Sequence, residues 1–353
     1  MSEVICTMLL PFSWLYGLAA AARNSAFDIG LAPRRRASVP VIAVGNLTAG
    51  GTGKTPLVEH ITGRLASRGL NVAVVSRGYG RRSRGVVVVS CRGKIRADAS
   101  TGGDEPVQIA RKFPSASVVV GERRIAAAAE AVRVCGAEVI VLDDAFQHRA
   151  IDRDLDILVI DSGRDFLKER LLPSGLRREW YTGLRRAGLI GFSHAAEGGD
   201  PPWAGALSRW SDARSFAYMT RIDKFCTMPG DDTVGGVALR GKRVLAFSGI
   251  GSHGGFVSSL RAEGLDVAAE RRFRDHHIYT GKDLDAILSA GRGMDACMTT
   301  EKDMVRIAAD PGLMRRIDGR VPFMYAVAKI GILRGEEMLE RAISGVLTGR
   351  RNQ

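Results

Sequence analysis

The sequence predicts an α/β protein with a mainly parallel sheet covered by helices on both faces, joined to a second, smaller α/β domain. Three observations lead to this prediction. Short apolar runs alternate with helical stretches, a glycine-rich loop joins the first run to the first helix, and a second strand–helix series begins near residue 243. The chain has 353 residues, of which 45% are hydrophobic and 25% charged, which is typical of a folded protein and not of a disordered one.

The predicted elements follow one another as repeated strand–helix units. In the first series the expected strands are residues 39–44, 71–76, 86–90, 94–96, 117–120, 138–142 and 155–160. The expected helices of that series are residues 56–67 and 123–134. The second series has expected strands at 243–248, near 267, at 296–299 and at 322–327, and a closing helix over 335–347.

Composition divides the chain into four expected parts. They are an apolar N-terminal helix over 1–30, a larger nucleotide-binding domain over 31–215, a linker over 216–235, and a smaller α/β domain over 236–353. The linker is placed where Gly, Pro and Asp accumulate and the strand–helix pattern loosens.

The N-terminal segment 4–22 carries no charge and includes Trp14 and Tyr16. A signal peptide needs basic residues before its apolar run, but only Glu3 is present there. Pro11 and several small residues weaken a membrane-spanning helix. Two interpretations stay open: a helix lying on the membrane surface, with the Arg-rich stretch 34–36 beside anionic lipid, or a helix packed on its own domain.

The net charge indicates the kind of partner, and the cysteine spacing bears on metal and redox sites. Lys and Arg number 51 against 38 Asp and Glu, a net charge of +13, which favours an anionic partner such as nucleic acid, a phosphorylated metabolite or an acidic membrane. The five cysteines are scattered and form no C-x-x-C pair, which argues against a zinc or redox motif. We expect them to be free thiols that serve as small packing residues in a reducing compartment.

A phosphate-binding loop follows the first apolar strand and opens the first helix. It has the form of a Walker A loop, in which glycines turn successive backbone N–H groups toward the phosphates of a nucleotide. The lysine of such a loop reaches the β- and γ-phosphates, and the hydroxyl that follows it binds Mg²⁺. The loop predicts an ATP-type P-loop NTPase fold, and its expected nucleotide-binding residues are Thr48, Ala49, Gly50, Gly51, Thr52, Gly53, Lys54 and Thr55.

Two carboxylates end the apolar strand over 138–142. Asp143 and Asp144 form a Walker B arrangement, and parallel strands bring their carboxyl ends to one edge of a sheet. We therefore expect Thr55, Asp143 and Asp144 to hold Mg²⁺ together. Asp161 ends the next strand and is a weaker candidate; a lone Asp in such a place is more often a helix cap.

A candidate acid–base pair lies outside these motifs. Asp104 stands in a glycine-flanked acidic turn, and His276 belongs to an Asp-His-His sequence in the second domain. A kinase that phosphorylates a sugar hydroxyl needs a carboxylate or an imidazole to accept the proton and orient the oxygen toward the γ-phosphate. Acidic turns and exposed histidines are common, so the residues alone leave this dyad as one hypothesis beside a purely structural role.

Taken together, these motifs resemble those of the tetraacyldisaccharide 4′-kinases, the lipid A kinases of Gram-negative-type bacteria. The similarity extends from the apolar N-terminus to the last helix, and the motifs are specific in combination. They are Val-Gly-Asn-x-Thr-x-Gly-Gly-Thr-Gly-Lys-Thr-Pro at 44–56, Ser-Arg-Gly-Tyr-Gly at 76–80, Gly-Asp-Glu-Pro at 103–106, Leu-Asp-Asp-Ala-Phe-Gln-His at 142–148, Leu-Leu-Pro-Ser-Gly at 171–175, Phe-x-Asp-His-His-x-Tyr at 273–279 and Thr-Thr-Glu-Lys-Asp at 299–303.

The resemblance implies a reaction and its partners. The family transfers the γ-phosphate of ATP, with Mg²⁺, to the 4′-hydroxyl of a lipid-linked glucosamine disaccharide 1-phosphate, forming lipid IVA at the cytoplasmic face of the inner membrane. It assigns the catalytic dyad to Asp104 and His276, and it places Asp143 and Asp144 near the metal. It implies a peripheral or N-terminally anchored enzyme on an anionic membrane, with no nucleic acid as partner and no obligate protein partner evident.

Some stretches depart from the family pattern. Residues 172–180 lack two of the usual prolines, residues 249–253 read Gly-Ile-Gly-Ser-His in place of Gly-Ile-Gly-Asn-Pro, Arg274 replaces a frequent Pro, and Ala145 replaces a Gly. These positions bear on the acceptor or the crevice between domains, and the catalytic positions are intact.

Two other function classes compete with the kinase. A partitioning-type ATPase that uses ATP as a switch carries a Lys just before the loop glycines, where this chain has Ala49. A nucleic-acid-binding NTPase needs aromatic residues among its basic stretches, and those stretches have little beyond Tyr79.

Overall fold

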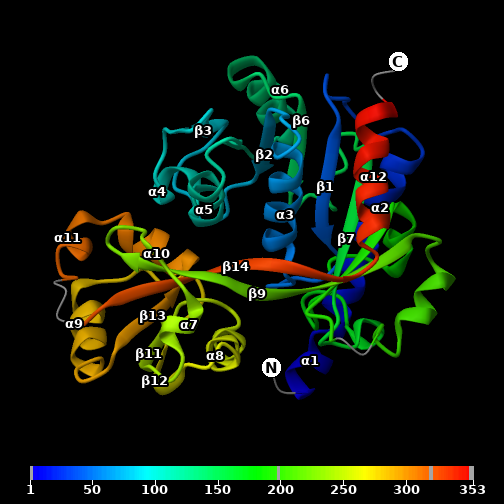
Figure 1. Ribbon diagram of the computed structural model, residues 1–353. Coiled ribbons are helices and arrows are strands. Elements are labelled where there is room, and N and C mark those ends of the chain that lie inside the picture. Colours follow the sequence, from blue (N-terminus) through cyan, green and yellow to red (C-terminus); the bar gives the residue numbers. More distant parts are fainter. Residues whose placement is uncertain (1–2, 197–198, 318–320, 350–353) are drawn as a thin grey trace.

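A single mixed sheet runs through the whole molecule (Figure 1). The computed structural model describes residues 3–196, 199–317 and 321–349; residues 1–2 and 350–353 of the two expected terminal parts lie outside this range. Within these described residues, fourteen strands form the sheet, in the order β12-β11-β13-β14-β9-β8-β7-β1-β6-β2-β5-β3-β4, with β10 paired to β9. The predicted mainly parallel α/β class is confirmed.

The larger half of the sheet holds the first series of strands. They are β1 (Val41–Asn46), β2 (Val72–Ser76), β3 (Val87–Cys91), β4 (Lys94–Ile95), β5 (Ser117–Val120), β6 (Val139–Asp143), β7 (Leu155–Asp161) and β8 (Leu189–Ser193). Strands β5, β2, β6, β1, β7 and β8 are parallel to their neighbours in this series, and β3 and β4 continue the edge antiparallel. Strand β6 lies on one side of β1 and β7 on the other, so the ligand crevice of such a sheet is expected at the carboxyl end of β1.

Helices cover both faces because successive strand residues point to opposite sides. In β1, Ile42 and Val44 belong to the core under α3 (Lys54–Ala66), and Val41 and Ala43 to the core under α6 (Arg124–Cys135). These strand residues are fully buried, as expected for a parallel sheet with two covered faces. The closing helix α12 (Glu336–Gly349) lies beside α3, where Arg64 and Arg68 pair with acidic residues of its first turns.

The smaller half holds the second series. Its strands are β11 (Arg243–Ser248), β12 (Asp266–Arg272) and β13 (Ala296–Thr300), and its helices are α7 (Gly236–Leu239), α8 (His253–Ala262), α9 (Gly281–Ala290), α10 (Glu301–Ala308) and α11 (Pro311–Met314). The remaining short helices all belong to the larger half: α4 (Ala99–Gly102), α5 (Asp104–Lys112), η1 (Phe166–Lys168), η2 (Tyr181–Arg186) and η3 (Ala204–Arg209).

Two long strands join the halves. β9 (Arg214–Met228) and β14 (Phe323–Arg334) pair antiparallel along most of their length and cross between the halves in Figure 1, and β10 (Thr233–Val234) adds to β9. The segment 216–235, expected to be a linker, lies between the two halves, and most of it is strand β9. The Gly- and Pro-containing stretch that suggested a linker is the turn between β9 and β10.

The cysteines also differ from expectation. Cys91 at the end of β3 and Cys135 at the end of α6 form a disulfide, so the prediction that all five are free thiols is wrong for this pair. Cys6, Cys226 and Cys297 are free, and the last two are buried as packing residues. No local pattern indicates this pair, because 43 residues separate the two positions and only the fold brings them together.

The N-terminal segment forms α1 (Glu3–Met8) and α2 (Leu10–Asp28). One side of α2 packs on the protein: Ser13 and Gly17 are buried, and Ser13 Oγ donates to the carbonyl of Leu171 at 3.1 Å. The other side leaves large apolar side chains in the open, with Leu15 and Leu18 both 67% exposed. No helix among the described residues has the length and apolar character needed to cross a bilayer. The helix thus packs on its own domain and also presents an apolar face.

A buried charge cluster lies between the two halves. Nζ of Lys112, in α5, contacts Glu59 of α3 at 2.8 Å and Glu301 of α10 at 3.1 Å, and it also donates to the carbonyl of Ala328 in β14. Burial, with repulsion from Glu301, raises the pKa of Glu59 to about 7 although Lys112 opposes the shift. Two buried carboxylates thus depend on one ammonium group, which comes from the larger half.

We predict that Lys112→Met destabilises the fold by about 3–5 kcal/mol, because it leaves both carboxylates buried without a counter-charge. A folded-state pKa above the ordinary value favours the folded state at low pH, and that stability is lost as pH rises through the folded pKa. The wild type should lose it between about pH 4.5 and 7. Without Lys112 the pKa of Glu59 rises further, so the variant continues to lose stability above pH 7, where the wild type no longer does. The difference in the free energy of unfolding between the two should therefore widen above pH 7.

Denaturant unfolding across this pH range measures the effect. Arg341→Met is the matched control, since it removes one positive charge from an exposed ion pair with Glu337, and it should change stability little. A Lys112→Met deficit that stays the same at every pH would contradict the prediction.

Candidate active site

The phosphate-binding loop lies between β1, which ends at Asn46, and α3, which begins at Lys54. Its last residue, Gly53, has a φ of 72°, in the left-handed region that favours glycine, and it turns the chain into the helix. The Asn46 side chain is buried and donates to Thr52 Oγ1 at 2.7 Å, which ties the end of β1 to the loop. The predicted residues 48–55 thus form one loop and the first helical turn, where backbone N–H groups and the helix dipole favour an anion.

A second segment braces this loop from outside. The Ala49 N–H donates to the carbonyl of Leu176 at 2.7 Å, and Thr48 pairs with Arg177 in a short antiparallel bridge. This brace belongs to the stretch 171–178 that carries the Leu-Leu-Pro-Ser-Gly motif. The same stretch accepts the hydrogen bond of Ser13, so the N-terminal helix contacts the segment that holds the phosphate loop.

The two predicted metal-site carboxylates lie beside the loop. Asp143, the last residue of β6, is opposite Val44 in the strand register, and Asp144 follows it with a φ of 46°. Burial, together with the charges of Glu105 and Asp144, raises the pKa of Asp143 to about 7. Burial also opposes ionisation of Asp144, but Lys54 and Arg178 outweigh it and lower the pKa of that carboxyl.

These residues fit a magnesium ion that also binds a nucleotide. Among the described residues no cluster of three or more His, Cys, Asp or Glu forms a complete metal cage. Mg²⁺ does not need one, because it usually binds one or two carboxylates and takes its other ligands from phosphates and water. Burial first, and then the negative charges of Glu105 and Asp144, raise the pKa of Asp143, and a divalent cation beside it would stabilise its ionised form.

Sequence reasoning missed Arg178 as part of this site. Its Nη1 donates to both oxygens of Asp144, at 3.0 and 3.1 Å, while Lys54 Nζ lies 3.6 Å from Oδ1 of Asp144. Asp144 is thus held between two cations. The position lies in the stretch 172–180, which had drawn attention only for its missing prolines.

The candidate dyad brings the two halves of the sheet together. Asp104 is the first residue of α5 and not part of an isolated turn, and its Oδ2 lies 3.4 Å from Nδ1 of His276 in the smaller half. The ring of Tyr79 is 5.3 Å from the His276 ring, centroid to centroid. Burial works against ionisation of Asp104, but its contacts with His276 and Arg306 outweigh burial and lower the pKa of the carboxyl.

Glu105 links the dyad to the phosphate loop. It forms an ion pair with Lys302, the Lys of the Thr-Thr-Glu-Lys-Asp motif, across the two halves. Burial raises the pKa of Glu105, and the charges of Lys302 and Lys54 lower it by more. Because Glu105 also raises the pKa of Asp143, the acids, the loop lysine and the dyad belong to one electrostatic site. Asp161, the weaker candidate, lines a small pocket together with the loop residues 48–52 and pairs with His194 at 3.0 Å.

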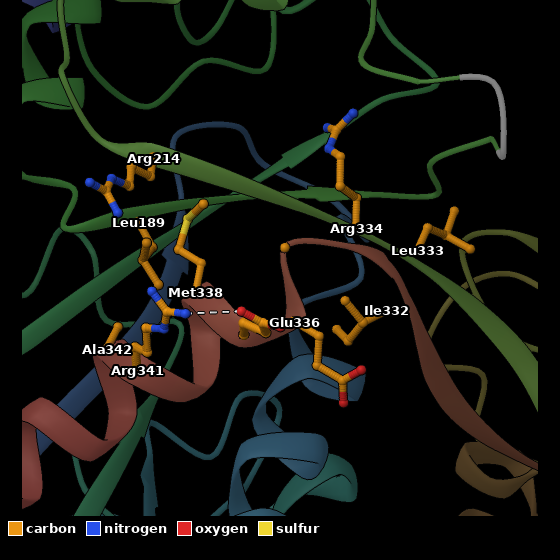
Figure 2. Close-up of a pocket in the computed structure, with 11 residues that line it drawn as sticks. Leu189, Arg214, Ile332, Leu333, Arg334, Glu336, Met338, Arg341 and Ala342 are labelled. Atoms are coloured by element: carbon orange, nitrogen blue, oxygen red, sulfur yellow. Dashed lines mark hydrogen bonds and ion pairs between the residues drawn. The ribbon is translucent and has the colours of Figure 1, made fainter.

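One large pocket lies elsewhere. It has a volume of about 810 Å³ and is lined by residues at the starts of β8 and β9, at the end of β14 and in α12, among them Leu189, Arg214, Ile332 and Met338 (Figure 2). Since β8 runs parallel to β7 and β1, this pocket is at the opposite edge of the sheet from the phosphate loop. Its size is therefore no guide to the active site.

Comparisons with known proteins agree with this geometry. A family model described as tetraacyldisaccharide-1-P 4′-kinase matches residues 5–347. A tetraacyldisaccharide 4′-kinase from Anaeromyxobacter sp. (strain Fw109-5) is 40% identical over 98% of this chain and 92% of its own length. One from Chlorobium luteolum is 39% identical over 96% and 97%. A crystal structure of an "apo" form of LpxK from Aquifex aeolicus in complex with ATP is similar with a TM-score of 0.78 and 30% identity, covering 97% of this chain and 99% of that one.

Gly103, directly before Asp104, provides a test of the site's backbone. Its φ of 94° and ψ of 152° are nearly restricted to glycine, and an added Cβ would lie 3.2 Å from both Gly78 Cα and the Tyr79 carbonyl oxygen. We predict that Gly103→Ala costs about 1–3 kcal/mol of stability and lowers turnover by displacing Asp104. Thermal unfolding and phosphate transfer measure the two effects.

Gly80→Ala is the control, because Gly80 has a φ of 78° but open space around its Cα. It should cost some stability and leave turnover unchanged. Equal turnover in the two variants would show that the close approach of residues 78–79 does not position Asp104.

Proposed function

The chain belongs to the tetraacyldisaccharide 4′-kinase family, and from its site we propose how its residues carry out the reaction. The enzyme transfers phosphate from ATP to the 4′-hydroxyl of tetraacyldisaccharide 1-phosphate, the 4′-phosphorylation step in lipid A biosynthesis. One observation carries the proposal: the phosphate loop with its two acids and the Asp104–His276 pair are joined through Glu105 into one site.

ATP binds with its β- and γ-phosphates in the loop 48–55. Lys54 lies against Thr52 and Asp144, within the site, and its charge stabilises the phosphoryl group during transfer. Asp143, Asp144 and Thr55 would hold a Mg²⁺ ion, which would neutralise charge on the phosphates. Arg178 and Lys54 keep Asp144 ionised, as a metal ligand must be.

Asp104 accepts the proton of the acceptor's 4′-hydroxyl, with His276 beside it in the site. Among the described residues, His276 and Arg306 contact the carboxylate of Asp104 at Oδ2, which leaves Oδ1 for the acceptor. As the O–H bond breaks, the hydroxyl oxygen forms a bond to the γ-phosphorus, the bond from that phosphorus to the β–γ bridging oxygen breaks, and ADP leaves. A carboxylate that is ionised and held in place suits this role.

The acceptor's acyl chains imply that the enzyme works at a membrane. The apolar face of α1 and α2 and the basic stretch 34–36 support binding to the anionic cytoplasmic face of the inner membrane. Through Ser13 and Leu171 this helix contacts the segment that braces the phosphate loop. The stretch 171–178 therefore connects the phosphate loop to α2, the helix that carries the proposed membrane-binding face.

We predict that Asp104→Asn lowers kcat by about 10²–10⁴-fold, because the amide cannot accept the hydroxyl proton. ATP affinity should stay close to that of the wild type, since the loop 48–55 is unchanged. Transfer of labelled phosphate to the lipid acceptor in mixed micelles measures kcat, and titration with a fluorescent ATP analogue measures binding.

Asp266→Asn, at an exposed position in β12, is the control for loss of one carboxylate and should leave both quantities unchanged. If Asp104→Asn retained wild-type turnover, another group would have to accept the proton.

We also predict that Leu15→Glu with Leu18→Glu weakens binding to vesicles containing phosphatidylglycerol. Both side chains are exposed on α2, and each new carboxylate is costly to bring into the membrane interface. Flotation with vesicles at low and high salt measures binding, and salt should weaken it by screening the basic stretch.

The control is Ile95→Glu with Val237→Glu, which makes the same chemical change at exposed apolar positions outside α1 and α2. If both double variants bound equally to vesicles, the apolar face of α2 would not be the membrane contact.

A further inference from the structure

The geometry points to Arg306 as a positioning residue of the phosphate transfer, which orients Asp104 and His276 through the two arms of its guanidinium group. Its Nε donates to Oδ2 of Asp104 at 2.6 Å, and its Nη2 lies 3.2 Å from Nδ1 of His276. This inference rests on the proposed role of Asp104. It adds a third member to the dyad, from helix α10 of the smaller half.

Two hydrogen bonds compete for Nδ1 of His276: one in which it accepts from Arg306, and one in which it donates to Asp104. Arginine is always charged and has only donors, so Nδ1 must carry a lone pair to accept from Nη2. The same nitrogen must carry a proton to donate to Asp104. The contact between Arg306 and Asp104 is 2.6 Å, whereas that between His276 and Asp104 is 3.4 Å. The shorter contact belongs to Arg306, which therefore holds the carboxylate.

This arrangement fixes the tautomer of His276. With Nδ1 accepting from Arg306, the ring proton of the neutral imidazole lies on Nε2. Nε2 is 3.9 Å from the nearest oxygen of Asp275, beyond hydrogen-bond reach, and the His276 side chain is 34% exposed. The Nε2–H group is therefore free to meet a bound acceptor or phosphate.

Arg306 is itself held rigidly. Its side chain is 6% exposed, and Nη1 donates to the carbonyl of Gly249 at 2.7 Å and to Oδ1 of Asp303 at 3.0 Å. Asp303 is fully buried and also accepts from the Gly249 N–H and from the Thr300 hydroxyl. A guanidinium group with four partners in a buried place cannot swing freely, which suits a positioning role.

The same carbonyl extends the effect of Arg306 to the backbone of His276. Gly249 O accepts from both Nη1 of Arg306 and the N–H of His276, the latter at 3.1 Å. His276 has a φ of 57°, an uncommon conformation for a non-glycine residue. Arg306 thus supports the histidine at its ring and, through Gly249, at its backbone.

The test compares two substitutions of one residue. Arg306→Gln removes the charge and the fork, and Arg306→Lys keeps a charge but has no fork that can reach both partners. Arg111→Gln is the matched control, because it removes an arginine from the same contact between α5 and α10. Arg111 is exposed, and its Nη1 donates to Met304 Sδ and not to Asp104 or His276. Kinetics are measured against ATP and lipid acceptor over the pH range in which each variant stays folded.

For Arg306→Gln we expect kcat to fall about 10²-fold with little change in the KM for ATP, because a misplaced dyad affects transfer and not the phosphate loop. The acid limb of the kcat profile should move to higher pH, since burial then acts on Asp104 with less compensation. The substitution leaves in place the other charged or titratable residues around Asp104 and His276, which are Tyr79, Glu105, Asp275, Tyr279, Lys302 and Asp303.

For Arg306→Lys the acid limb should stay near that of the wild type while kcat lies between those of the wild type and Arg306→Gln. Arg111→Gln should match the wild type in both. If Arg306→Gln fails to fold, as thermal unfolding would show, Arg306→Lys alone decides. A wild-type kcat in Arg306→Lys overturns the role of the fork, and an unmoved acid limb in folded Arg306→Gln overturns the action on Asp104.

The parallel Asp104→Asn variant separates this inference from the proposed function. If Asp104→Asn is inactive while both Arg306 variants behave as the wild type, only the role of Arg306 fails. If Asp104→Asn is active, the proton-accepting role fails and the basis of this inference with it.

Discussion

The contact between helices α5 and α10 is the interaction on which the site depends. Helix α5 belongs to the larger half of the sheet and begins with two carboxylates, Asp104 and Glu105. Helix α10 belongs to the smaller half and places Arg306 and Lys302 against them. The proposed proton acceptor is thus carried by one half, and the cation that orients it comes from the other. An ordered site requires both halves to be in contact.

The sheet makes this contact possible without a loose connection. Strands β9 and β14 pair with each other along most of their length, and each also belongs to the sheet of one half. The Lys112 cluster lies close to this pair, since Lys112 reaches the Ala328 carbonyl in β14 as well as Glu59 and Glu301. Backbone pairing and a buried counter-charge therefore fix the relation between the halves near the place where α5 meets α10.

Local sequence patterns predicted the features that neighbouring residues determine, namely the phosphate loop and most strands of the parallel sheet. The phosphate loop could be placed because strand, glycines, Lys54 and helix follow one another within about fifteen residues, and the apolar runs showed most strands of the parallel sheet. The long strand β9 was missed because its exposed positions carry charged residues such as Arg221, Asp223 and Lys224, which hide the apolar alternation. The Cys91–Cys135 pair was missed because it depends on tertiary structure alone.

The same limit explains which site residues were missed. Asp104 and His276 were paired on chemical grounds and by resemblance, and the structure places them 3.4 Å apart. Arg178 and Arg306 were not found, because nothing in the local sequence of an arginine shows which carboxylate it will meet. One signal was available: Asp303 and Arg306 are one helical turn apart, at the spacing at which an acid and a base pair on a helix.

Charge explains why the site needs all of these arginines and lysines. Four carboxylates meet here: Asp104, Glu105, Asp143 and Asp144. Three of them have lowered pKa values because each has a cation beside it: Arg306 at Asp104, Lys302 at Glu105, and Lys54 with Arg178 at Asp144. Burial raises the pKa of Asp143 to about 7, because the charges of Lys54 and Arg124 offset burial only in part. Asp143 is thus the carboxyl of the site whose charge the protein's own cations balance least, and a metal ion bound with a nucleotide at the phosphate loop would add positive charge there.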